Sequence, residues 1–68
     1  MPKARRVLAA LQRNGWVIVR TAGSHKRLEK AGIRATFAFH DNADLGNVQL
    51  AQVARDFGYT LDELRKLV

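Results

Sequence analysis

The two histidines of the chain, His25 and His40, are the side chains with the clearest catalytic potential. His25 ends a Gly-Ser-His turn, and His40 follows fifteen residues later. Histidine changes its charge near neutral pH, so it can take up or give up a proton in the cell. Cleavage of RNA needs a base that activates the ribose 2′-hydroxyl and an acid that protonates the leaving 5′-oxygen. His25, and after it His40, are therefore candidates for acid–base catalysis of RNA cleavage.

Cationic groups stand close to this turn and along the N-terminal segment. RNA cleavage needs them because positive charge stabilises the crowded, phosphorane-like transition state. We expect the cations of the first helix to form a phosphate track and those near the turn to bind the reacting phosphate, together with the turn amides. The candidate RNA-binding residues are Lys3, Arg6, Arg13, Arg20, Gly23, Ser24, Lys26 and Arg27.

Each histidine also has a purely structural interpretation. A histidine in a turn is commonly a polar surface residue, and His40 at a strand end could cap the Asp- and Asn-rich loop that follows it. Ser24 fits a turn residue or a phosphate donor better than a nucleophile, because no acid is placed to orient a histidine against it. The chain has no cysteine and no carboxylate cluster with ligand spacing, so we expect neither a metal nor a cofactor.

The charge of the chain is strongly one-sided. The net charge is +6, and residues 1–34 hold nine Lys or Arg against one acid, whereas residues 35–68 hold three against five. A one-sided positive field attracts polyphosphate and speeds encounter with it. This distribution favours a nucleic acid as the partner.

Length and composition limit the architecture. Sixty-eight residues make one domain at most, and we expect a single domain over residues 1–68. The absence of cysteine suits a reducing cytosol, so we expect a cytoplasmic protein. No apolar run approaches the length of a membrane span, and we expect neither a signal peptide nor a membrane partner.

The pattern of apolar residues predicts helices around a short three-stranded sheet. Apolar residues at i, i+3, i+4 and i+7 mark the first two helices, and the Thr-Leu-Asp-Glu run at Thr60 is a capping box that starts the third. We expect an α+β fold of the order α-β-β-β-α-α, with an antiparallel sheet and helices on one face. The predicted elements are a helix over 3–14, strands over 16–20, 25–30 and 34–40, a loop over 41–47, a helix over 47–57 and a last helix from Thr60.

A tight turn about Ala31-Gly32 would place the second and third strands in a defined register. Glu29 would then face Arg34, and the apolar Leu28 and Phe37 would share the helix-covered face. His25 and His40 would share the other, open face. A three-residue turn would shift the pairing by one residue and reverse the relative faces. We favour the first register because it gathers the apolar residues on one side.

The run "LAALQRNGWVIVRTAGSHKRL" resembles the HicA family of bacterial toxin ribonucleases. The most specific part is the combination of Gly15-Trp16, Arg20 and Gly23-Ser24-His25, and the likeness continues through "FAFHD" and "LAQVARDFGYTLDEL". The resemblance implies a fold like a double-stranded-RNA-binding domain and cleavage of RNA, chiefly mRNA. It further implies that His25 is the catalytic histidine and that a HicB-like antitoxin neutralises the toxin.

The sequence departs from the family pattern at three places. Many members carry a second histidine directly after the first, where this chain has Lys26, a cation that cannot replace the lost proton carrier. Many also have a "P-x-H" end to the third strand and a "GTLR" start to the next helix, where this chain reads "AFH" and "VQLA". The departures leave room for a weakened or specialised toxin and raise interest in His40.

Two non-catalytic alternatives remain open at this point. Basic and aromatic residues interleaved at a duplex surface would suit a double-stranded-RNA binder. The Ala54 and Gly58 spacing would suit a helix-turn-helix that reads DNA, but the first residues of its recognition helix would be Leu61, Asp62 and Glu63. Two carboxylates aimed at a phosphate-lined groove are repelled, so we interpret this segment as a packed helical pair.

Overall fold

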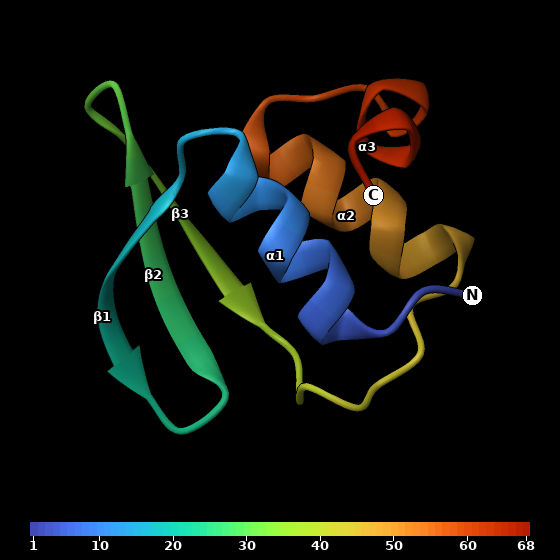
Figure 1. Ribbon diagram of the computed structural model, residues 1–68, viewed down its shortest axis with the longest axis horizontal. Helices are drawn as coiled ribbons and strands as arrows, with labels where there is room; N and C mark the ends of the chain where they lie inside the picture. Colours follow the sequence, from blue (N-terminus) through green and yellow to red (C-terminus); the bar gives the residue numbers. More distant parts are fainter.

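The helices and strands follow one another in the predicted order, α-β-β-β-α-α (Figure 1). The structure, a computed structural model, describes residues 1–68. Helices cover one face of the three-stranded antiparallel sheet, so the predicted α+β, double-stranded-RNA-binding-domain-like architecture is confirmed. The elements are α1 (Ala4–Arg13), β1 (Val17–Ala22), β2 (His25–Lys30), β3 (Ile33–Ala38), α2 (Asn47–Phe57) and α3 (Leu61–Leu67).

The apolar stripe of α1 is buried, as its spacing predicts. Ala4, Val7, Leu8 and Leu11 all lie in the core, where they join residues of the sheet and of the other helices. Burying each of the larger side chains stabilises the fold by about 1.5–3 kcal/mol. The charged residues of α1 are left on its outer side.

The two C-terminal helices pack as a pair, and their sequence signals act as predicted. Thr60 N–H donates to Glu63 Oε1 at 2.8 Å, and Glu63 N–H donates to Thr60 Oγ1 at 3.1 Å, which completes the capping box. These bonds to Thr60 hold the pKa of Glu63 below its ordinary value. Leu64, the apolar residue of α3 that faces inward, is fully buried.

A hydrogen bond between two aromatic side chains ties the start of the sheet to the helical pair. Trp16 Nε1–H donates to the Tyr59 hydroxyl at 3.0 Å, and the Trp16 ring meets Phe57 edge to face with centroids 4.7 Å apart. Trp16 is buried, so this bond satisfies an indole N–H that would otherwise be lost inside the protein. The C-terminal segment is thus part of the same core as the first strand.

The register of β2 and β3 is the one predicted from the Ala31-Gly32 turn. Glu29 lies opposite Arg34, and their side chains form an ion pair of 3.4 Å. Leu28 and Phe37 are buried under the helices, as expected. Along β2 and β3 these buried residues alternate with residues of the opposite face, which no helix covers. The uncovered face is therefore the one open to a ligand.

Strand β1 contains a β-bulge that its sequence does not predict. Ile18 lies opposite Leu28, but Arg20 lies opposite Arg27, so Val19 is an extra residue in the ladder. Such a bulge reverses the side on which the following residues point. Without it, Arg20 would fall on the helix-covered face.

The loop between β3 and α2 is fixed against the beginning of α1. Ala4 N–H donates to the Ala43 carbonyl at 2.8 Å, and Leu45 N–H donates to that of Pro2 at 2.9 Å. Leu45 is buried, so this loop contributes to the core. None of the helices has both the length and the apolar character that a membrane span requires.

The turn between β2 and β3 holds an alanine in an unfavourable conformation. Ala31 has φ of +50° and Gly32 has φ of +81°, the pair of positive values that a type I′ hairpin turn needs. Only Gly, and to a lesser degree Asn and Asp, adopt this conformation readily, because Cβ crowds the backbone.

Replacing Ala31 by Asn should therefore stabilise the protein. We expect a gain of about 0.5–1 kcal/mol in the free energy of unfolding, seen as a higher midpoint in urea with an unchanged slope. Gly32→Ala is the matched control and should destabilise, since it adds a Cβ at the second positive φ. A lower midpoint for Ala31→Asn would contradict the strained-turn interpretation.

Candidate functional site

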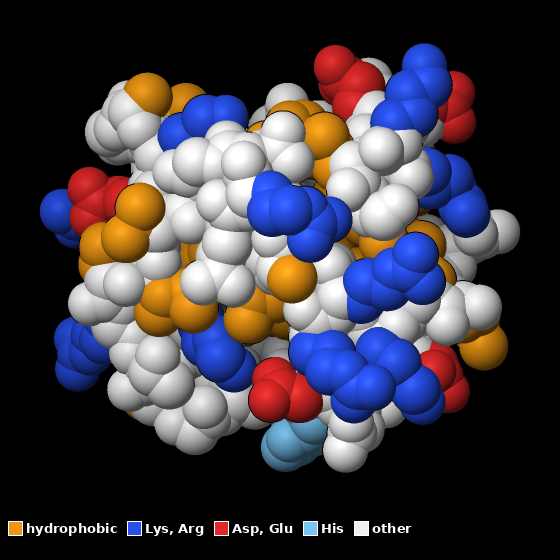
Figure 2. All heavy atoms as spheres, in the orientation of Figure 1, with side chains coloured by type: hydrophobic (Ala, Val, Ile, Leu, Met, Phe, Trp, Pro, Cys, Tyr) orange, Lys and Arg blue, Asp and Glu red, His pale blue; other side chains and the backbone are white.

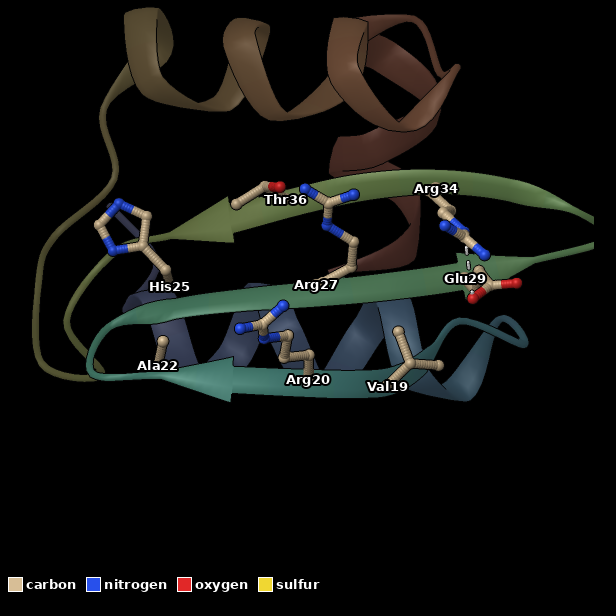
Figure 3. Close-up of a pocket in the computed structure, with 8 residues that line it drawn as sticks. All are labelled: Val19, Arg20, Ala22, His25, Arg27, Glu29, Arg34 and Thr36. Atoms are coloured by element: carbon tan, nitrogen blue, oxygen red, sulfur yellow. Dashed lines mark ion pairs between the residues drawn. The ribbon is translucent and has the colours of Figure 1, made fainter.

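The uncovered face of the sheet is hollowed along its middle (Figure 3). The hollow is shallow and open, with a volume of about 560 Å³. All three strands contribute to it, and its side chains are mostly charged or polar. The lining residues are Val19, Arg20, Ala22, His25, Arg27, Glu29, Arg34 and Thr36.

His25 stands at one end of this hollow, directly after the turn between β1 and β2. The turn consists of Gly23 and Ser24, and Gly23 has the positive φ, +61°, that its position requires. In the ladder His25 is flanked by Ala22 on one side and Ala38 on the other. Because both neighbours are small, the imidazole is exposed and the space above it is free.

Two arginines lie next along the hollow and have no acidic partner. Arg20 of β1 is directly opposite Arg27 of β2, and Thr36 of β3 lies on the other side of Arg27. The only acid in the hollow, Glu29, is paired with Arg34 at the far end (Figure 3). The hollow therefore combines an exposed imidazole with two unpaired guanidinium groups, a combination suited to an anionic ligand.

Lys26, expected beside His25, points to the opposite face of β2. It lies opposite Phe37 and Thr21, on the helix-covered side, and its side chain is only 18% exposed. Lys26 Nζ lies 3.7 Å from Asp41 Oδ1. The structure therefore does not bring Lys26 together with His25.

The predicted cations of α1 lie in the helical layer, away from the hollow. Basic side chains gather on the face of the molecule over α1 (Figure 2). Lys3 Nζ pairs with Asp44 Oδ1 at 2.9 Å, and Arg13 Nη2 donates to the Leu67 carbonyl at 3.4 Å. Arg6 borders a separate depression with Arg65. The expected phosphate track is thus split, and two of its three members have partners within the protein.

His40 lies beyond the sheet and does not line the hollow. The last pair of β2 and β3 is His25 with Ala38, so His40 follows the end of the strand. It is exposed, and its carbonyl accepts a hydrogen bond from Ala43 N–H at 3.0 Å, which starts the loop. Gly23 and Ser24 form the turn but are not lining residues either.

Sequence reasoning left Arg34 and Thr36 out of the candidate site, although both line the hollow. The signal was present, because the register that puts His25 on the open face also puts Thr36 and Arg34 there. No group of three or more His, Asp and Glu side chains lies close enough together to hold a metal ion.

The fold and this face define a class of protein. A three-stranded antiparallel sheet, helices on one of its faces and the order α-β-β-β-α give the double-stranded-RNA-binding-domain-like architecture, here with a histidine among arginines on the free face. Residues 4–59 of the 68 match the family model described as the HicA toxin of bacterial toxin–antitoxin systems. The chain therefore belongs to the HicA toxin family, whose members are toxins partnered by an antitoxin. No curated protein matches the sequence.

The ion pair between Lys3 and Asp44 should make stability depend on pH. The hydrogen bond from Lys3, and then its charge, lower the pKa of Asp44 below its ordinary value of 3.8. A carboxyl with a lowered pKa stabilises the folded state above the pKa of the unfolded chain, and this contribution is lost as the pH falls through the folded value.

Asp44→Asn should therefore lower the melting temperature at pH 7, and the difference from the unmodified protein should shrink as the pH falls below 3.8. Thermal melts over a pH series measure this. The control is Asp56→Asn, which removes an exposed acid that forms no ion pair. A difference for Asp44→Asn that is the same at every pH would contradict the ion-pair account.

Proposed function

We propose that this toxin is a metal-independent endoribonuclease that cleaves mRNA and so inhibits translation, with His25 as its catalytic group. One observation carries the proposal: His25 is exposed at the end of the hollow, next to two arginines without acidic partners. The family supplies the toxin role, and the exposed imidazole and unpaired arginines of this face support RNA as the proposed target.

The reaction follows from the groups in the hollow. His25 takes the proton of a ribose 2′-hydroxyl, the 2′-oxygen forms a bond to the adjacent phosphorus, and the bond from phosphorus to the 5′-oxygen breaks. The leaving 5′-oxygen receives its proton back from the same imidazolium, because the hollow contains no second imidazole. The products are a 2′,3′-cyclic phosphate and a 5′-hydroxyl end. The arginines of the hollow bind the anionic backbone of the RNA and so hold the strand against His25.

A HicB-like antitoxin is the partner we propose. Because the hollow is cationic and open, an acidic segment laid across it would bind by charge complementarity and cover His25. Blocking the substrate and binding the toxin would then be one event.

A non-catalytic double-stranded-RNA binder is the second candidate. One observation favours it: His25 has no second proton carrier beside it, since Lys26 points to the other face and His40 lies beyond the sheet. A helix-turn-helix factor is less favoured, because the exposed residues at the start of α3 are Asp62 and Glu63.

The decisive test is His25→Ala. We expect it to abolish RNA cleavage and growth arrest, with a melting temperature within about one degree of the unmodified protein, because the exposed ring forms no hydrogen bond that folding needs. Cleavage is measured on a transcript whose new ends are mapped, and a 2′-deoxy substitution at the mapped position should block it. His40→Ala is the matched control and should keep most of the activity.

Equal cleavage by His25→Ala would defeat the catalytic assignment. RNA binding without new ends by the unmodified protein would support the binder instead. Preferential competition by duplex DNA would support the helix-turn-helix alternative.

A further inference from the structure

We propose that Arg20 and Arg27 together form a phosphate subsite, which binds the phosphodiester next to the one that is cleaved at His25. This inference rests on the proposed function, since it takes RNA to be the ligand. It adds that the protein binds at least two neighbouring phosphates of one RNA strand, and that the second is bound by this arginine pair.

The first argument is the unusual pairing of the two residues. Arg20 and Arg27 are cross-strand neighbours on the same exposed face. Like charges directly opposite each other destabilise a sheet, and neither residue has an acidic partner. The pair therefore makes no favourable contribution to folding that would explain it, whereas a bound anion between the two guanidinium groups would remove the repulsion.

The contrast with the next row of the sheet is informative. There Arg34 is neutralised by Glu29 at 3.4 Å, in the ordinary arrangement of opposite charges across strands. The positive charge of the hollow is therefore concentrated at Arg20 and Arg27. These two lie between His25 at one end and the neutral pair at the other (Figure 3).

The spacing separates the subsite from the catalytic position. His25 and Arg27 are two residues apart on β2, which is about 7 Å along a strand. Figure 3 shows the Arg27 side chain reaching across the sheet toward Thr36, and that of Arg20 lying between β1 and β2. One phosphate at His25 and its neighbour at the arginine pair match this arrangement better than one phosphate shared by all three.

The bulge at Val19 places Arg20 in the subsite. With regular alternation from Ile18, Arg20 would point to the helix-covered face and Arg27 would stand alone. The extra residue brings Arg20 round to the face of His25. The irregularity of β1 thus has a consequence for binding that core packing alone does not require.

The first test measures binding of a short 2′-O-methyl RNA, which cannot be cleaved, by fluorescence anisotropy over a series of salt concentrations. Arg20→Gln and Arg27→Gln should each weaken binding about ten-fold and lower the salt slope by about one unit. Arg55→Gln, which removes one exposed charge from α2, is the matched control and should leave the slope unchanged. Unchanged slopes for both hollow variants would overturn the proposal.

A second test addresses the position of the bound phosphate. Uncharged methylphosphonate linkages are placed, one at a time, on either side of the mapped cleavage position. One of the two should slow cleavage by the unmodified protein about ten-fold, and should slow Arg20→Gln no further. If cleavage persists but neither linkage acts differently on the variant, the subsite fails while the proposed function stands.

A third measurement separates ligand binding from a structural role. Because Arg20→Gln relieves a like-charge contact, its melting temperature at low salt should equal or exceed that of the unmodified protein. A lower melting temperature together with weaker binding would overturn the subsite. If the unmodified protein leaves every RNA intact, the proposed function fails, and the salt slopes decide the subsite by themselves.

Discussion

The burial of Leu28 and Phe37 under the helices is the constraint on which the open face depends. Both side chains are almost completely inaccessible, and each stabilises the fold by about 1.5–3 kcal/mol. A slip of one residue would expose them and turn Arg27 toward the core, where an unpaired charge costs several kcal/mol more. The position of His25 is therefore a consequence of core packing on the other side of the same strands, which explains how so small a protein holds an exposed imidazole in a fixed place.

In β1, core packing does not determine the position of every residue. Trp16 is anchored by Tyr59 and Phe57, and Ile18 continues the packed side, but the bulge at Val19 then gives up regular pairing. The bulge places Arg20 opposite Arg27, and this pair of like charges is repulsive in the free protein. Exposure to water and salt keeps this repulsion small. The structure thus departs from the most stable arrangement at the place where the proposed ligand binds, as stability–function trade-offs predict.

The parts of the fold that could be predicted from the sequence are those that local signals determine. The stripe of α1, the capping box at Thr60 and the turn at Gly32 gave correct elements, and the last gave the register and faces of β2 and β3. The bulge could not be predicted, because the run that contains Val19 is apolar on both sides and its alternation is uninformative. The ion pair between Lys3 and Asp44 could not be predicted either, because it depends on the loop between β3 and α2 packing against the start of α1.

The register also changes the meaning of Lys26. Where the sequence was compared with the family pattern, a lysine in place of a second histidine suggested the loss of a proton carrier beside His25. Position 26, however, lies opposite Phe37 on the covered face, and its side chain pairs with Asp41. A histidine there would point away from the hollow, because adjacent residues of a strand face opposite sides. The substitution therefore affects the packing beneath the sheet, and His25 is the imidazole that lines the hollow with or without it.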